Sequence, residues 1–405
     1  MASVRFSKEW LLVGGSFLAL SIIFSARATL GLAMPHVEAE TGWNRSFMSA
    51  VMSATLIFMA VMAPVAGRLI DRIGPRIVLL TGTAAVIVGS IVLAVSTEPW
   101  MFVVGFAGLS GLGFALVANA TIGATIALTF TERRGLATGI ATSGSSAGQF
   151  IFIPIVAAIL AASSWRNAFW LNAALAAGIL VILYFLLERK KKEPKAVVVG
   201  APTMMDDVRY LFSKPAFYLL FFSFFICGIT SLGIVETHFM PYAPLCGFPP
   251  VPTATAYGLL SAFNLVGMIV AGWLSDRVNR VSLLASIYFI RGLSFFLLVG
   301  TGASYEVLIA FAMLFGLVDY ATVPVTVSLA ASHLGARVLG LAMGLITCGH
   351  QLGSATGAFV GGFLFDTAAN YSTMWLAGVW TAMGAAGLAL LIFRTTPVTK
   401  PLSAA

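Results

Sequence analysis

Apolar stretches of about 20 residues recur twelve times between Trp10 and Phe393, and they restrict what this chain can fold into. Each stretch is long enough to cross ~30 Å of hydrocarbon as a helix. Because no water bonds the backbone there, such segments must be helices or closed barrels. Period-2 alternation is absent, so the sequence predicts an all-α membrane protein. The expected spans are 10–35, 46–67, 76–97, 99–128, 136–162, 166–187, 216–243, 255–275, 281–301, 306–330, 338–364 and 372–393.

The composition argues against a soluble enzyme. Charged residues make up 9% of the 405 positions, against roughly 25% in a soluble domain. No metal-ligand cluster, nucleophile elbow or phosphate-binding loop occurs in the sequence, so we expect no enzyme, no cofactor and no metal. The three cysteines, Cys227, Cys246 and Cys348, lack disulfide or metal spacing and are expected to behave as small hydrophobic residues.

The net charge of +8 is concentrated on one side of the predicted membrane. An even number of spans puts both termini on one side, and the positive-inside rule then places that side in the cytoplasm. This distribution, rather than nucleic-acid binding, explains the charge, and it predicts a multi-pass protein of the cell inner (plasma) membrane. The Lys and Arg residues on the terminus side are Arg5, Lys8, Arg68, Arg72, Arg76, Arg133, Arg134, Arg189, Lys190, Lys191, Lys192, Lys195, Arg209, Lys214, Arg277, Arg280, Arg337, Arg394 and Lys400; Arg45 and Arg166 fall on the other side, and Arg27 and Arg291 lie within spans.

The chain is an internal repeat. "GRLIDR" begins at Gly67 and "GWLSDR" at Gly272, while "GLATGIATSGSSAG" begins at Gly135 and "GLAMGLITCGHQLG" at Gly340, both at an offset of 205 residues. Parallel six-helix repeats with a site at their interface are typical of secondary transporters. We therefore expect an N-terminal six-helix bundle over 1–188, a polar cytoplasmic linker over 189–214 and a C-terminal six-helix bundle over 215–405.

These motifs carry a resemblance to known transporters. "GRLIDRIGPR" (67–76) and "GWLSDRVNR" (272–280) resemble the repeated loop motif of the major facilitator superfamily. "TFTERRGLATGIATSGSSAG" (129–148) and "GLAMGLITCGHQLGSATGAFVGGFLFD" (340–366) are similar to the fifth and eleventh helices of the monocarboxylate transporter family, and within it to bacterial proton-coupled L-lactate transporters. The resemblance implies a cytoplasmic gate built from the loop motifs, with pure topology signals as the alternative. The gate residues are Gly67, Arg68, Asp71, Arg72, Asp276, Arg277 and Arg280.

Two charged residues inside the spans have no counterpart in the other half. Subtracting the offset of 205 shows that the equivalent position in the first half is Phe114 for Asp319 and Val86 for Arg291. Both lie about mid-depth in neighbouring spans, so pairing would spare each an isolated charge in hydrocarbon. Protonation of Asp319 would free the guanidinium to bind a substrate carboxylate, whereas the alternative is a permanent structural ion pair.

Further candidates are polar residues within or at the ends of the spans. Arg27, in the first span, lies near a position where the monocarboxylate family places a Lys. Within the eighth span, the stretch 261–272 lacks the Asp and Arg of the animal members, so Arg291, Arg27 and Arg280 all remain candidates for the anion-binding cation. The candidates for substrate binding are Arg291, Arg27, Asn119, Asn264 and Tyr320, and those for proton coupling are Asp319, His350, His238 and Glu236.

The sequence therefore predicts an alternating-access symporter that carries a small monocarboxylate, such as L-lactate, with a proton. An organic anion exchanger of the oxalate/formate type is the alternative, because it needs the cation but no titrating acid. A drug or sugar carrier needs neither an anion-binding cation nor a titrating acid. The expected partners are the monocarboxylate, the proton and the lipid bilayer, and the carrier is expected to be monomeric.

Overall fold

The computed structural model describes residues 8–43, 45–187, 203–299, 304–368 and 371–398. Within these ranges twelve helical segments are long and apolar enough to cross a membrane, which confirms the predicted fold class. The first of them continues to Thr41, beyond the expected end at residue 35, because a helix does not have to end where its apolar stretch ends. The segments run Glu9–Thr41, Phe47–Ile73, Pro75–Ala94, Pro99–Thr129, Arg134–Ala162, Trp165–Leu186, Pro215–Ala243, Pro252–Ser275, Arg280–Val299, Tyr305–Leu334, Ala336–Phe365 and Ser372–Arg394.

The helices form two halves. The first contains α1 (Lys8–Thr41), α2 (Arg45–Ile73), α3 (Pro75–Ala94), α4 (Pro99–Phe102), η1 (Val103–Ser110), α5 (Gly111–Leu116), α6 (Asn119–Thr129), α7 (Arg134–Ala162) and α8 (Trp165–Leu186). The second contains α9 (Met204–Phe212), α10 (Pro215–Gly228), η2 (Ile229–Glu236), α11 (Thr237–Leu245), α12 (Pro250–Ser275), α13 (Arg280–Val299), α14 (Tyr305–Val318), α15 (Thr322–Leu334), η3 (Ala336–Val338), α16 (Leu339–Ala368), α17 (Ser372–Leu391) and η4 (Ile392–Arg394).

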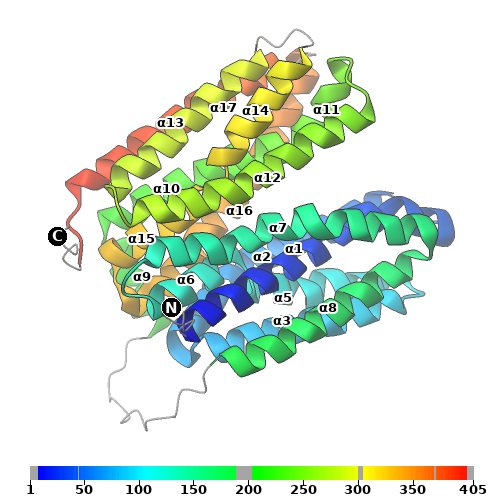
Figure 1. Ribbon diagram of the computed structural model, residues 1–405, viewed down its shortest axis with the longest axis horizontal. Coiled ribbons are helices and arrows are strands. Elements are labelled where there is room, and N and C mark those ends of the chain that lie inside the picture. The colour runs from blue at the N-terminus through cyan, green and yellow to red at the C-terminus, as the bar shows by residue number, and fades with distance from the viewer. Residues whose placement is uncertain (1–7, 44, 188–202, 300–303, 369–370, 399–405) are drawn as a thin grey trace, which may run out of the picture.

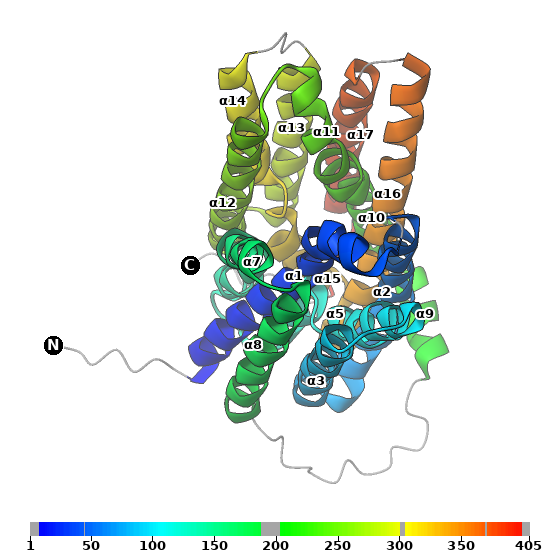
Figure 2. The ribbon, with the colours of Figure 1, turned by 90° about the vertical axis from the view of Figure 1, so that its right-hand side faces the viewer.

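The two halves lie against each other at the end where α1 begins and α17 ends, and they diverge toward the opposite end (Figure 1; Figure 2). We call the first of these the terminus-side end. The helices that pack across it are α2 with α16, α7 with α12, and α6 with α15. Three alanines of α6, Ala120, Ala124 and Ala127, belong to the same buried cluster as residues of the second half. The terminus-side end is therefore a packed interface.

Glycines make this close packing possible. A Cβ on Gly67 of α2 would overlap the carbonyl group of Gly340 of α16, and a Cβ on Gly135 of α7 would overlap that of Gly272 of α12. Small residues let helix backbones approach closely in lipid, where packing drives association. The repeat offset relates Gly67 to Gly272 and Gly135 to Gly340, so the α2–α16 and α12–α7 contacts are two copies of the same helix crossing.

Three of the spans are not continuous α-helices. The fourth is interrupted at 117–118 between α5 and α6, and the tenth at 319–321 between α14 and α15. The seventh contains the π-helical segment η2, and the fourth also contains η1. Non-helical backbone at membrane depth occurs where protein or a water-filled cavity surrounds it. These interruptions therefore mark the part of the fold where a site is expected.

A short helix, α9, occupies the end of the predicted linker; residues 188–202 of that linker lie outside the described residues. Its N-terminus is closed by a capping box, in which Thr203 and Asp206 bond to each other's backbone amides. The hydrogen bonds that Thr203 donates hold the pKa of Asp206 below its ordinary value. Tyr210 of α9 donates to the carbonyl of Leu334, and Leu211 is buried in the same cluster as residues of α15, so α9 packs against the second half.

Candidate transport site and gate

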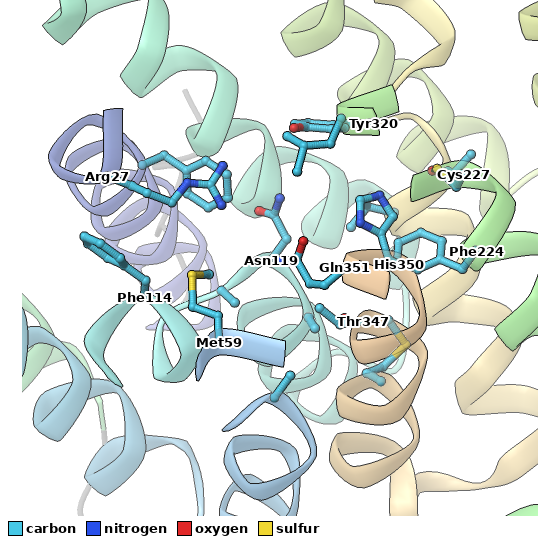
Figure 3. Close-up of a pocket in the computed structure, with 18 of the residues that line it drawn as sticks. Arg27, Met59, Phe114, Asn119, Phe224, Cys227, Tyr320, Thr347, His350 and Gln351 are labelled. Carbon is cyan, nitrogen blue, oxygen red and sulfur yellow. The ribbon is translucent and has the colours of Figure 1, made fainter. Parts of the chain in front are cut away.

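A cavity of about 90 Å³ lies between the two halves. This is several times the ~10–15 Å³ that one water requires. Side chains of Arg27, Asn119, His350 and Gln351 point toward one another in this space (Figure 3). The full lining is Ile23, Phe24, Arg27, Met59, Ala63, Phe114, Ala118, Asn119, Ala120, Phe224, Cys227, Leu232, Tyr320, Thr322, Val323, Met343, Thr347, His350 and Gln351.

The cavity ends at the packed terminus-side interface. Met343, Thr347 and Gln351 follow one another at four-residue intervals on α16, so they lie on one helix face. Met343 is the nearest of the three to the start of α16. Its neighbour Gly344 packs against α2, since a Cβ there would lie 2.7 Å from the Cα of Pro64. The close contact between α16 and α2 therefore begins at the residue next to Met343, at the terminus-side end of the cavity.

Arg27 is the cation that lines the cavity. Its guanidinium carbon lies 4.6 Å from the ring centre of Phe24, one turn earlier on α1. Among the described residues no carboxylate forms an ion pair with Arg27. Asn119 adds an amide whose Nδ2 donates to Ser145 Oγ over 3.4 Å, while its buried Oδ1 has no partner in the described structure. Together they present a positive charge and a free acceptor to the cavity.

Arg291 and Asp319 lie together inside the second half. Arg291 Nη2 is 3.7 Å from Asp319 Oδ1, and both side chains are 0% exposed. Ser231 of η2 donates to the same carboxylate, and Asn264 Nδ2 lies 3.5 Å from Asp319 Oδ2. Neither Arg291 nor Asp319 lines the cavity. In this conformation, the role of anion ligand expected of Arg291 is therefore not available to it.

The interrupted tenth span explains why these charges can be buried. Arg291 Nη2 donates to the carbonyl of Val318 over 2.7 Å and also to that of Asp319, the carbonyls at the end of α14. A cation stabilises the carbonyl end of a helix, and an anion stabilises the amide end, here that of α15 after Asp319. Arg291 Nη1 lies 3.0 Å from Cys227 Sγ, 3.2 Å from Thr230 Oγ1 and 3.1 Å from Ser231 Oγ, whereas its buried Nε has no partner among the described residues.

A chain of hydrogen bonds connects Asp319 to the cavity. Tyr320, which lines the cavity, donates its backbone amide to Asn264 Oδ1 over 3.0 Å. Its hydroxyl donates to Glu236 Oε1 over 2.6 Å. Asn264 in turn reaches Asp319, so the candidates Asn264, Tyr320 and Glu236 form one polar network with it. Asn264 and Glu236 themselves lie outside the cavity lining.

The two candidate histidines occupy different places. His350 lines the cavity, and its ring centre lies 4.9 Å from that of Phe224. His238 is buried between α11 and α16, with Nε2 3.1 Å from the carbonyl oxygen of Ala358. It lies outside the cavity lining, so only His350 is positioned to meet a ligand there.

The loop-motif carboxylates bind helix N-termini of the opposite half. Asp71 accepts from the amides of Gly340 and Leu341, each over 2.8 Å. Its repeat counterpart Asp276 accepts in the same way from the amides of Gly135 and Leu136, also over 2.8 Å. An anion at a helix N-terminus is stabilised by the unbonded amides and by the helix dipole. Each half is thus fastened to the other by a charge-assisted bond pair.

The gate arginines are arranged less symmetrically than the aspartates. Arg68 and Arg337 both form ion pairs with Asp207 of α9, whose side chain is only 1% exposed. Arg277 lies over the ring of Trp273 at 4.1 Å, and Arg280 Nε donates to the carbonyl of Ser275 over 2.9 Å. Arg280 is therefore held at the terminus-side end, away from the cavity. The remaining gate candidate, Arg72, lies in the last turn of α2.

Two functional contacts were not predicted from the sequence. Cys227 was expected to be a small hydrophobic residue, but its sulfur accepts a bond from Arg291 and lines the cavity. Cys227 does lie in a buried hydrophobic cluster, as expected, but a lone Cys carries no spacing signal that would predict its contact with Arg291. Asp207 was also missed, although the pattern of Thr203 followed three residues later by Asp206 indicates a helix start within the linker.

Comparison with known proteins agrees with this architecture. The family model of the Major Facilitator Superfamily matches residues 16–304 and, in a second match, 263–405. The chain belongs to this superfamily. Its members are transporters rather than enzymes, and the twelve spans make the chain a multi-pass membrane protein.

Several relatives cover most of the chain. Monocarboxylate transporter 13 of Rattus norvegicus is 26% identical over 392 residues, which is 94% of this chain and 88% of the relative. The uncharacterised MFS-type transporter YcxA of Bacillus subtilis (strain 168) is 26% identical over 337 residues, or 81% of each. The resemblance to monocarboxylate transporters is thereby confirmed.

Solved structures support the fold. The proton:xylose symporter XylE, bound to 6-bromo-6-deoxy-D-glucose, superposes with a TM-score of 0.73 at 14% identity and covers 96% of both chains. The E. coli fucose:proton symporter FucP gives a TM-score of 0.74 at 15% identity, covering 94% of this chain and 98% of FucP. At such identities the likeness concerns the fold alone.

Proposed function

We propose that this transporter carries a small monocarboxylate, such as L-lactate, together with a proton. The observation that carries the proposal is the cavity between the halves, in which Arg27 has no carboxylate partner among the described residues and Asn119 has a free acceptor. A guanidinium binds a carboxylate through two parallel hydrogen bonds. The free Oδ1 of Asn119 suits a hydroxyl donor next to that carboxylate, as in a 2-hydroxy acid. The similarity to monocarboxylate transporters points the same way.

In this proposal Arg27 binds the substrate carboxylate, and Asp319 takes up the proton. Asp319 pairs with Arg291 when it is ionised, and it reaches the cavity through Asn264 and Tyr320. A proton on Asp319 leaves the charge of Arg291 uncompensated behind the cavity lining, next to Cys227, which favours binding of an anion nearby. Proton and substrate then bind together with no change in net charge.

Alternating access follows from the two fastenings at the terminus-side end. Asp71 and Asp276 hold the halves together through backbone amides, and such bonds can be exchanged for water when the end opens. We place this end and both termini in the cytoplasm of a cell with the protein in its inner (plasma) membrane, because of the charge asymmetry. Labelling of cysteines introduced one at a time at Ile77 and Val278, both exposed at this end, tests the placement in intact cells when it is compared with labelling of the three native cysteines alone.

The deciding experiment is uptake of labelled L-lactate into proteoliposomes with and without an inward proton gradient. Wild type is expected to accumulate lactate only with the gradient. Arg27→Gln is expected to lose uptake, and Arg27→Lys, which keeps the charge but not the paired donors, to retain part of it. Asp319→Asn is expected to lose the response to the gradient. Uptake that ignores the gradient in wild type would rule out symport.

An anion exchanger of the oxalate/formate type is the second candidate. It is favoured by one observation, the complete burial of the Arg291–Asp319 pair, which also suits a permanent structural role. Lactate counterflow between two sides of equal pH, with no proton movement and unchanged in Asp319→Asn, would establish exchange instead.

A further inference from the structure

The deepest part of the cavity is apolar. We call Met59 and Ala63 of α2, with Met343 of α16, the apolar floor. On α16 the floor at Met343 lies eight residues before Gln351, about 12 Å along the helix. The polar groups of Arg27, Asn119 and Gln351 are thus separated from the packed interface by a layer of hydrophobic side chains.

The wall of the first half continues this apolar surface. Of its lining residues only Arg27 and Asn119 are polar, and the apolar ones include Phe114 and Met59, which are drawn next to each other in Figure 3. A ligand whose carboxylate binds Arg27 therefore has its remaining atoms next to hydrophobic groups. The methyl group of lactate, two bonds from the carboxylate carbon, extends only a short way toward the floor.

We propose that the apolar floor selects monocarboxylates by their alkyl tail, so that acids with longer tails than lactate bind more tightly. The inference rests on the proposed function and adds the substrate class: 2-hydroxy monocarboxylates with a tail of two or more carbons. Methionine side chains are unbranched and flexible, so the floor adapts to tails of different shape. The second carboxylate of oxalate is bonded directly to the first, so it would lie beside Asn119 and meet the acceptor Oδ1 of that side chain instead of a donor.

Binding to the purified full-length protein tests the inference without interference from passive permeation of the longer acids. The probes are L-lactate, 2-hydroxybutyrate and 2-hydroxypentanoate, and the readout is thermal stabilisation as a function of ligand concentration. Burying one methylene group corresponds to about a fourfold change in Kd. We expect the Kd to fall by about that factor at each step, and oxalate to give no stabilisation.

Two matched pairs of variants locate the effect. Met59→Gln makes the floor polar at nearly constant volume and is expected to flatten the dependence of Kd on tail length, whereas Met59→Leu keeps it. Met343→Gln and Met343→Leu repeat the comparison from the other half. Arg27→Gln is expected to abolish binding of the whole series.

The outcomes separate the two proposals. A wild-type Kd that stays constant or rises with tail length, while L-lactate binds, overturns the apolar floor and leaves the proposed function intact. The same holds if both glutamine variants keep the full dependence. If none of the monocarboxylates stabilises the protein, the proposed function fails and the inference fails with it.

Discussion

Replacing Gly67 by alanine is expected to open the terminus-side end. A Cβ at this position would lie 2.5 Å from the carbonyl carbon of Gly340, and both groups belong to helix backbones that cannot rotate away. Ordinary contacts begin near 3.4 Å and the carbonyl oxygen of Gly340 lies closer still, so α2 and α16 must separate by at least about 1 Å. That movement also lengthens the 2.8 Å bonds from Gly340 and Leu341 to Asp71 beyond good hydrogen-bond geometry.

The size of the effect follows from the cost of overpacking. Inserting a methyl group into a closely packed site typically costs about 1–3 kcal/mol. Because the cost falls only on the conformation in which the halves touch, the ratio of closed to open molecules should drop by roughly 5- to 150-fold. Gly272→Ala is expected to act in the same direction, since its Cβ would lie 2.9 Å from the Cα of Gly139.

Distance distributions between spin labels at Ile77 and Val278, one on each half, measure this ratio directly. Gly178→Ala is the matched control, because a Cβ on that glycine, in the middle of α8, meets nothing within 4 Å. Gly67→Ala should enlarge the long-distance population, and Gly178→Ala should leave it as in wild type. Identical distributions for Gly67→Ala and wild type would refute the idea that this contact holds the closed end.

Three further predictions concern charged residues. Asp319→Asn removes the counter-ion of Arg291 and should lower the free energy of unfolding by about 3–5 kcal/mol, with part recovered by adding Arg291→Gln, as measured by denaturation in detergent. Asp207→Asn breaks both ion pairs of α9 and should increase the label distance at the terminus-side end, whereas the same change at Asp206, exposed and one residue away, should not. Because the pKa of Asp206 is lowered, its contribution to the α9 cap is complete above the ordinary aspartate pKa and is lost as pH falls through the lowered value; hydrogen exchange of the α9 amides from neutral to acid pH should show this loss.

The sequence predicts the fold well because membrane insertion imposes a simple rule on it. Apolar length alone defines the spans, and the offset of 205 residues divides them into halves. Subtracting the repeat also identified Arg291 and Asp319 as exceptions, and the structure brings them within 3.7 Å. Mid-depth placement in neighbouring spans was sufficient for that prediction, since two buried charges stabilise each other when they meet.

Which of Arg27 and Arg291 lines the cavity was not predictable in the same way. It depends on the interruption at 319–321, which the continuous apolar run around it conceals. Pro324, in the first turn of α15, is the one local sign of a new helix start. Which face of a span meets the cavity is decided by packing between helices far apart in the chain, and one sequence contains no measure of that packing.

The carbonyls of Val318 and Asp319, left without helical partners where the tenth span is interrupted, affect the energy of protonating Asp319. They anchor the guanidinium of Arg291 whether or not the neighbouring acid carries a proton, so titration need not move a cation through the hydrophobic interior. On the proposed mechanism, one proton entering this wall is balanced by one bound anion. The loaded carrier then has the same total charge as the empty one, and no net charge is moved per cycle, so the membrane voltage should neither drive nor oppose net transport.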